Sequence, residues 1–177
     1  MKMHTLLGAA AVATMATAAS ADVELEFENF QAAGSQFGMV DVNPVAGVLD
    51  MVVADFWLNA DGENWTWCND LTVLIASDDL SDILVQVGGY SDYGAAHKFA
   101  WETGSDGTAG TVGGGNVAIG GLDCTGYYVW LGNGYGGGGV GDWSGAIDLT
   151  GSIDYVPAPG ALALLGLGGL VARRRRA

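Results

Sequence analysis

Residues able to do acid–base or nucleophilic chemistry are few in this chain of 177 residues. His97 is the only histidine after the first 21 residues, and no Gly-x-Ser-x-Gly motif presents a nucleophilic serine. The His and Cys ligands of an ordinary zinc site are lacking, as is a phosphate-binding loop followed by Lys-Ser. A carboxylate pair acting as in a glycoside hydrolase is the one enzymatic alternative that remains. We therefore predict a protein that is not an enzyme.

Tryptophans are the best candidates for a binding site. Trp65 and Trp67 follow a polar turn, residues 59–64, and are two positions apart, so on a strand they would face the same way. Exposed rings can stack on sugar faces, and we hypothesise that these two form a carbohydrate platform. Core positions are the alternative interpretation for three others, which lie within or beside predicted strands: Trp57, Trp130 and Trp143.

Oxygen ligands lie in the same turn. Asp61, Glu63 and Asn64 offer hard oxygen atoms of the kind that calcium prefers, although not at EF-hand spacing. A second acidic cluster comprises Asp78, Asp79 and Asp82. Two interpretations stay open for both clusters, a calcium site or solvated acidic turns.

The charge of the middle of the chain is strongly negative. Residues 22–155 contain all 20 acidic residues and one basic residue, Lys98, so 1 − 20 gives a formal charge of −19. Such a surface repels phosphate backbones and excludes nucleic acid as a partner. The acidity fits either solubility in salty surroundings or the binding of divalent cations.

Two cysteines, Cys68 and Cys124, lie in this middle segment. An even pair in an exported protein usually forms a disulfide, which here would close a loop and stabilise the fold by about 4 kcal/mol. The sequence therefore predicts a Cys68–Cys124 disulfide, with two free thiols or a cysteine nucleophile as the alternatives.

Short apolar or alternating runs separated by Gly, Asn and Asp predict an all-β domain over residues 22–155. Glycine-rich joints are expected at 104–115 and 132–141, and residues 78–82 fit either one helical turn or a loop. This pattern favours an antiparallel β-sandwich or jelly roll. The expected strands are 23–27, 48–58, 71–76, 83–87, 99–102, 117–119, 127–131 and 146–155.

The first 21 residues have the features of a signal peptide. Lys2 is followed by an apolar run from Leu6 to Ala19, and Ala19-Ser20-Ala21 fits the small-x-small pattern that signal peptidase cuts. The protein is therefore expected to be exported, with signal peptidase as a first partner.

Residues 156–177 contain Val156-Pro157-Ala158-Pro159-Gly160, an apolar run, and the basic cluster Arg173, Arg174, Arg175 and Arg176. The prolines end any preceding element, the apolar run is short for a stable span, and the arginines stay on the cytoplasmic side of a membrane. This tail resembles the PEP-CTERM sorting signal, with Ala158 where that family usually has glutamate. The resemblance implies an exosortase as partner, a short hydrophobic C-terminal helix anchored transiently in the inner membrane, and a final place at the cell surface or in extracellular polysaccharide.

Two segments of the middle domain, 69–77 and 141–149, resemble strands of proprotein-convertase P-domains. That resemblance implies a jelly roll that is accessory rather than catalytic, and often binds calcium. Taken together, the sequence predicts a non-catalytic exported surface or matrix protein that is an exosortase substrate. The alternatives are a calcium-assisted carbohydrate-binding module and, as a third choice, a glycoside hydrolase.

Overall fold

The computed structural model describes residues 22–156. The predicted signal peptide, including Ala19 and Ala21, and the predicted sorting tail after Val156 lie outside these described residues. Within 22–156, no helix is long and apolar enough to cross a membrane. The described segment is all-β, as predicted, and its main sheets are built from antiparallel strands.

The first sheet has four long strands, all antiparallel to their neighbours. Inward and outward side chains alternate along them, because successive side chains of a strand point to opposite faces. In sheet order the strands are β1 (Val23–Ala33), β10 (Val140–Gly151), β4 (Val48–Leu58) and β8 (Val112–Asp123).

The second sheet has five shorter strands, of which the last pair is parallel. A separate two-stranded ribbon joins β3 (Val45–Ala46) to β11 (Asp154–Tyr155). Two 3₁₀ turns, η1 (Glu63–Trp65) and η2 (Cys68–Asp70), connect β4 to β5. The order in the second sheet is β2 (Phe37–Met39), β9 (Tyr128–Asn133), β5 (Leu71–Ala76), β6 (Ile83–Val87) and β7 (His97–Phe99).

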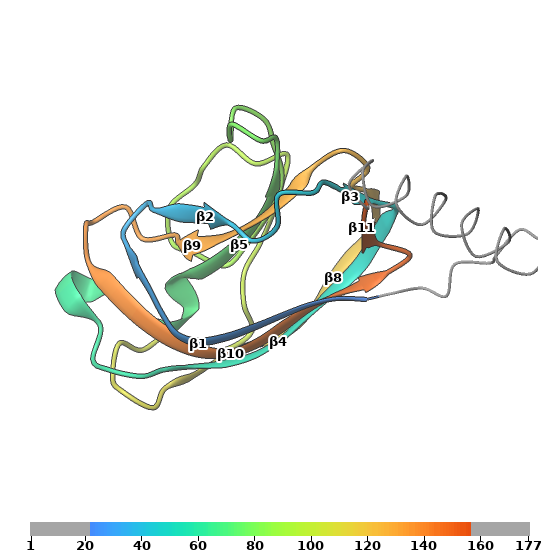
Figure 1. The fold of residues 1–177 in the computed structure, drawn as a ribbon. Coiled ribbons are helices and arrows are strands. Elements are labelled where there is room, and N and C mark those ends of the chain that lie inside the picture. The colour runs from blue at the N-terminus through green and yellow to red at the C-terminus, as the bar shows by residue number, and fades with distance from the viewer. Residues whose placement is uncertain (1–21, 157–177) are drawn as a thin grey trace, which may run out of the picture.

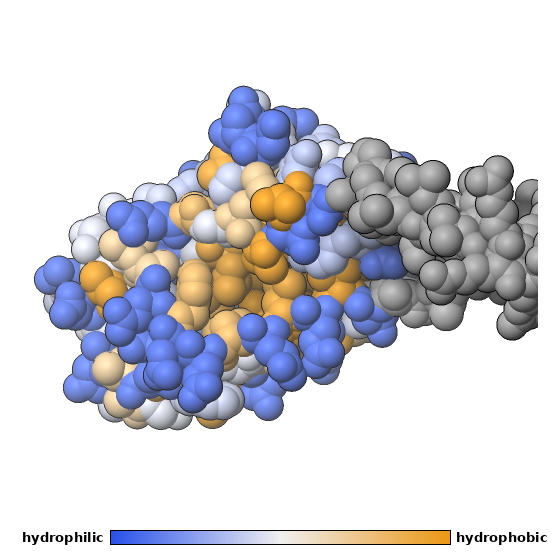
Figure 2. Space-filling model, viewed as in Figure 1, coloured by the Kyte–Doolittle hydropathy of each residue, from blue (hydrophilic) through white to orange (hydrophobic). Residues whose placement is uncertain are grey.

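One hydrophobic core draws its side chains from both sheets. Figure 1 shows β1, β10 and β4 below and β2 and β9 above, with the core between these layers. Trp143, Phe56 and Leu49 are among its largest fully buried side chains. Figure 2 shows apolar side chains in a hollow between the layers, rimmed by hydrophilic residues.

The glycine-rich joint expected at 104–115 is wrong over residues 112–115, which belong to β8. Gly113 lies so close to the core that a Cβ there would be 2.5 Å from the Phe56 ring and 2.9 Å from the sulfur of Cys68. The next residue, Gly114, has φ +116, which side chains rarely adopt. These glycines lie inside a strand, where the lack of a side chain lets neighbouring atoms pack closely. They do not form a joint between strands.

The predicted Cys68–Cys124 disulfide is wrong, because both cysteines are free and buried. The Cys68 thiol donates to the carbonyl of Thr111 at 3.2 Å, and that carbonyl also accepts the N–H of Leu58 at the end of β4. The N–H of Cys124 instead donates to the carbonyl of Gly47, just before β4. The length of β4 separates the two sites by roughly 30 Å, whereas a disulfide needs Cα atoms within about 7 Å.

Candidate functional site

Four aromatic side chains surround a cavity of about 260 Å³ at the surface. Trp65 and Tyr90 are 78% and 79% exposed, and Trp67 is 42% exposed. We call Trp65, Trp67, Tyr90 and Tyr135 the aromatic platform. So many exposed rings in one place are unusual, since large aromatic side chains are normally well buried.

Trp65 and Trp67 line the same cavity, although not for the reason that the sequence suggested. They lie in and after the 3₁₀ turn η1 rather than on a strand. Asn64 and Trp65 both have left-handed backbone angles, with φ of 48° and 71°. That conformation costs about 1–2 kcal/mol per residue for side chains other than glycine. A strained backbone that exposes a tryptophan is a feature typical of binding sites.

Asp70 forms the floor of the aromatic platform. It lies in η2 and is 3% exposed. Its carboxylate accepts the backbone N–H of Trp67 at 2.7 Å, and the N–H of Tyr90 also lowers its pKa. Burial raises the pKa of this carboxyl above its ordinary value, while the two N–H donors oppose that rise. Asp70 therefore connects the segments that carry two of the four rings.

Sequence reasoning missed Tyr90 and Tyr135. Their rings are 6.3 Å apart between centroids and tilted by 59°. The two loops that carry them are joined, because Ser91 donates its N–H to Gly134 and accepts the N–H of Gly136 on its hydroxyl, each at 2.8 Å. A signal was available, since Gly-Gly-Tyr90 and Gly-Tyr135-Gly place a tyrosine in glycine-rich loops where it cannot pack as part of a strand.

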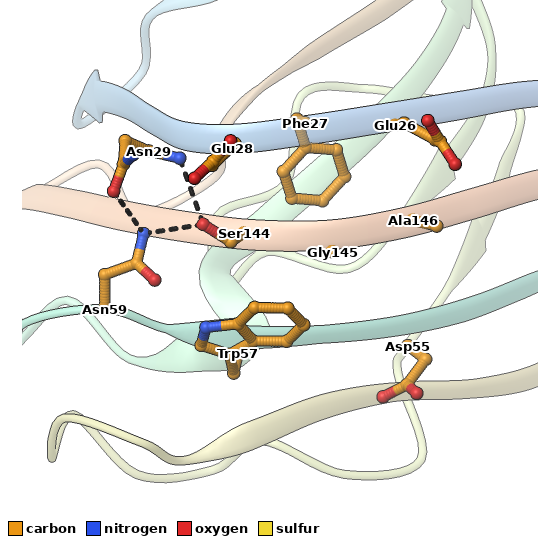
Figure 3. Close-up of a pocket in the computed structure, with 10 residues that line it drawn as sticks. All are labelled: Glu26, Phe27, Glu28, Asn29, Asp55, Trp57, Asn59, Ser144, Gly145 and Ala146. Atoms are coloured by element: carbon orange, nitrogen blue, oxygen red, sulfur yellow. Dashed lines mark hydrogen bonds between the residues drawn. The ribbon is translucent and has the colours of Figure 1, made fainter.

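A second, larger hollow of about 770 Å³ lies over β1, β10 and β4. Figure 3 shows the rings of Phe27 and Trp57 on either side of Gly145, which carries no side chain. We call this hollow, lined by the ten residues labelled in Figure 3, the sheet groove. Trp57 is 44% exposed, so the interpretation of this residue as core is wrong. Trp143 is fully buried, and Trp130 is partly buried with its indole N–H donated to Ser77.

The candidate calcium ligands are partly engaged elsewhere. The Asp61 carboxylate accepts the backbone N–H of Ala109 at 2.7 Å. Asp61 and Glu63 line a hollow with Asp142, whereas Asn64 is not among the residues that line it. Within residues 22–156, no group of three or more His, Cys, Asp or Glu side chains is arranged to hold a metal ion. Calcium binding remains a prediction.

The second acidic cluster organises the turn between β5 and β6, which contains no helical turn. The Asp79 carboxylate accepts the Ser77 hydroxyl at 2.8 Å and the N–H of Ser81 at 3.0 Å. These donors lower the pKa of Asp79 to about 2, and the hydrogen bonds from Ser81 have the largest effect. Asp82 accepts the hydroxyl of Tyr127 at 2.9 Å. The carboxylates of Asp79 and Asp82 thus have partners within the protein.

Comparisons with protein-family models, with curated proteins and with solved structures found no match to this chain. The proposed function therefore depends on the residues and the geometry described above.

Proposed function

We propose that this chain is a non-catalytic exported surface or matrix protein whose β-domain binds polysaccharide through the aromatic platform. The observation that carries this proposal is the gathering of Trp65, Trp67, Tyr90 and Tyr135 around one cavity above the buried carboxylate of Asp70. Aromatic faces cover the apolar C–H faces of sugar rings, and a few polar groups fix the orientation of a bound ligand.

The rigidity of the aromatic platform supports the proposal. Trp67 is fixed at its backbone by Asp70, and the loop of Tyr90 is bonded to the loop of Tyr135. Rings that are already in position lose little conformational entropy when a ligand binds, which favours affinity. A mainly apolar cavity at the surface also suits a partly hydrated chain of sugars better than a charged small molecule.

We infer further that the two sheets form a jelly roll. Leaving out the separate ribbon of β3 and β11 and the parallel strand β7, eight antiparallel strands remain. Numbered in chain order, they give sheet orders 1-8-3-6 and 2-7-4-5. These are the orders that result when an eight-stranded antiparallel ribbon is wound into two facing sheets. The single core shared by both sheets supports the same inference.

The export and sorting part of the proposal depends on residues 1–21 and 156–177. A small-x-small signal motif and a Pro-x-Pro, apolar and arginine tail similar to PEP-CTERM signals support it. Expressing the chain in a host with and without an exosortase tests it. We expect a C-terminal truncation in the exosortase host, and an identical C-terminal mass in both hosts would contradict sorting.

The binding part is tested with the purified full chain and two neutral probes, cellohexaose and the N-acetylglucosamine hexamer. We expect Trp65→Ala to weaken binding by about tenfold or more, with an unchanged unfolding midpoint because the side chain is exposed. Trp65→Phe keeps a ring and should retain most of the affinity. Val42→Ala, an exposed apolar position outside the aromatic platform, is the control. Equal affinity of Trp65→Ala and wild type would contradict the proposal, as would the release of new reducing ends from a probe.

A further inference from the structure

The sheet groove has a different character from the aromatic platform. As Figure 3 shows, amide and hydroxyl groups gather at one end beside Glu28, and the carboxylates of Glu26 and Asp55 lie at the other end. At the polar end, the Asn59 amide donates to Ser144 at 2.9 Å and to Asp142 at 2.7 Å, and the N–H of Asn29 donates to Ser144 at 3.0 Å. Ser144 is 5% exposed, so this end is held in place by a partly buried network.

The acidic end is defined by strand register. Glu26 pairs with Ala146, and Ala146 pairs with Asp55, so the two carboxylates lie on either side of a small residue. Two strand spacings separate their Cα atoms by about 10 Å. Both side chains are exposed, and Glu28 adds a third carboxylate to the lining.

No cationic side chain faces these carboxylates among the residues that line the sheet groove. The one Lys or Arg within residues 22–156 is Lys98, which lies on β7 of the other sheet and donates to the carbonyl of Ser91. The carboxylates of the sheet groove are therefore free to pair with a cationic ligand. A phosphorylated or carboxylated glycan would instead be repelled.

We propose that the sheet groove binds a polysaccharide rich in unacetylated amino sugars, with sugar rings stacked on Trp57 and their ammonium groups paired with Glu26 and Asp55. This inference rests on the proposed carbohydrate-binding function and names its substrate class. Ammonium–carboxylate hydrogen bonds are charge-assisted and stronger than neutral ones. A cation held over an indole face is attracted by the ring as well.

The probes that test this inference are the glucosamine hexamer and the N-acetylglucosamine hexamer, titrated into the purified full chain at a mildly acidic pH. They have the same ring backbone and differ in the charge of the nitrogen. We expect the wild type to bind the glucosamine hexamer at least about tenfold more tightly, and the difference to shrink with added sodium chloride.

The double variant Glu26→Gln/Asp55→Asn should lose this preference and bind both hexamers alike. Its charge-matched control is Asp78→Asn/Asp92→Asn, which removes two exposed carboxylates from loops at the ends of β6, in the other sheet. The control should retain the preference. An equal loss in the control would mean that overall charge attracts the probe, and would overturn the inference, as would equal binding of both hexamers to the wild type.

Trp57→Ala should weaken the binding of the glucosamine hexamer, whereas Trp57→Phe should retain most of it. Trp65→Ala separates this inference from the proposed function. If Trp65→Ala weakens the neutral hexamer while the sheet-groove variants change neither hexamer, the aromatic platform stands and the sheet-groove inference fails. If neither hexamer nor cellohexaose binds the wild type, the proposed function and this inference both fail.

Discussion

The carboxylate of Asp70 accepts the backbone N–H of Trp67 at 2.7 Å. The buried carboxylate beneath the aromatic platform is therefore hydrogen-bonded to the backbone of one of its four aromatic residues. The N–H of Tyr90, in the loop that follows β6, also lowers the pKa of this carboxyl. Asp70 therefore interacts with two segments whose rings are 23 positions apart in the sequence, since 90 − 67 = 23.

Removing the Asp70 carboxylate should loosen the aromatic platform. Asp70→Ala removes the acceptor of the Trp67 N–H, which should cost about 1–3 kcal/mol in the free energy of unfolding. Asp70→Asn keeps one acceptor oxygen and should cost less. Urea unfolding followed by tryptophan fluorescence measures both variants, and equal stability of Asp70→Ala and wild type would contradict the role of Asp70 as an anchor.

The raised pKa of Asp70 predicts a pH-dependent difference between wild type and Asp70→Asn. Because burial raises the folded-state pKa, the folded protein holds this proton more tightly than the unfolded chain. The resulting stabilisation is fully present below the ordinary pKa of 3.8 and is lost as the pH rises through the folded-state value. From about pH 3 to about pH 7, the stability of the wild type should therefore fall relative to that of Asp70→Asn. A constant difference between the two unfolding curves would count against a raised pKa.

The free cysteines should be unreactive in the native protein. Burial raises the pKa of the Cys68 thiol to about 12 and that of the Cys124 thiol to about 11, so little reactive thiolate forms near neutral pH. A disulfide exchange reagent at about pH 8 should label neither thiol in the folded state and both after unfolding in denaturant. Failure to label the unfolded, unreduced chain would restore the disulfide interpretation.

Close packing of β8 predicts that Gly113 does not tolerate a side chain. A Cβ at this position would overlap the Phe56 ring, and overpacking of a core typically costs about 1–3 kcal/mol. Gly113→Ala should therefore lower the unfolding midpoint in urea. Gly38→Ala is the matched control, because nothing lies within 4 Å of a Cβ built there on β2, and a similar loss in both variants would contradict the packing argument.

A calcium site at the turn of Asp61 should raise the thermal stability beyond the effect of ionic strength, because the Ala109 N–H occupies only Oδ1 of the Asp61 carboxylate. The measurement is the thermal unfolding midpoint with calcium, with chelator, and with sodium chloride of matched ionic strength. A ligand that binds only the native state raises that midpoint. A rise with calcium that Asp61→Asn abolishes would identify a metal site at this turn.

Sequence patterns predicted three strands with their exact bounds. They failed for the glycines of β8, because glycine occurs both in joints between strands and at close contacts inside a strand. Strands 48–58, 71–76 and 83–87 are confirmed, because their apolar runs are flanked by clear turn residues. The strands β2 and β3 were missed, being three and two residues long. The glycines of β8 pack against the core of the domain, which no local pattern reveals.

The candidate sites were only partly predictable for a related reason. Trp65 and Trp67 were found from their spacing and from the polar turn before them, whereas Tyr90 and Tyr135 join them only through tertiary contacts between loops. Trp57 could have been placed on the outer face, because it shares the two-residue period of Asp55, and a charged side chain rarely points into a core.

The separation of Cys68 and Cys124 along β4 also bears on how the chain can be produced. Without a cross-link to form, folding of residues 22–156 needs neither an oxidant nor a disulfide isomerase, and its stability does not depend on a disulfide. A copy made under reducing conditions should reach the same native state as one made under oxidising conditions. The described domain can therefore fold in a reducing or in an oxidising compartment.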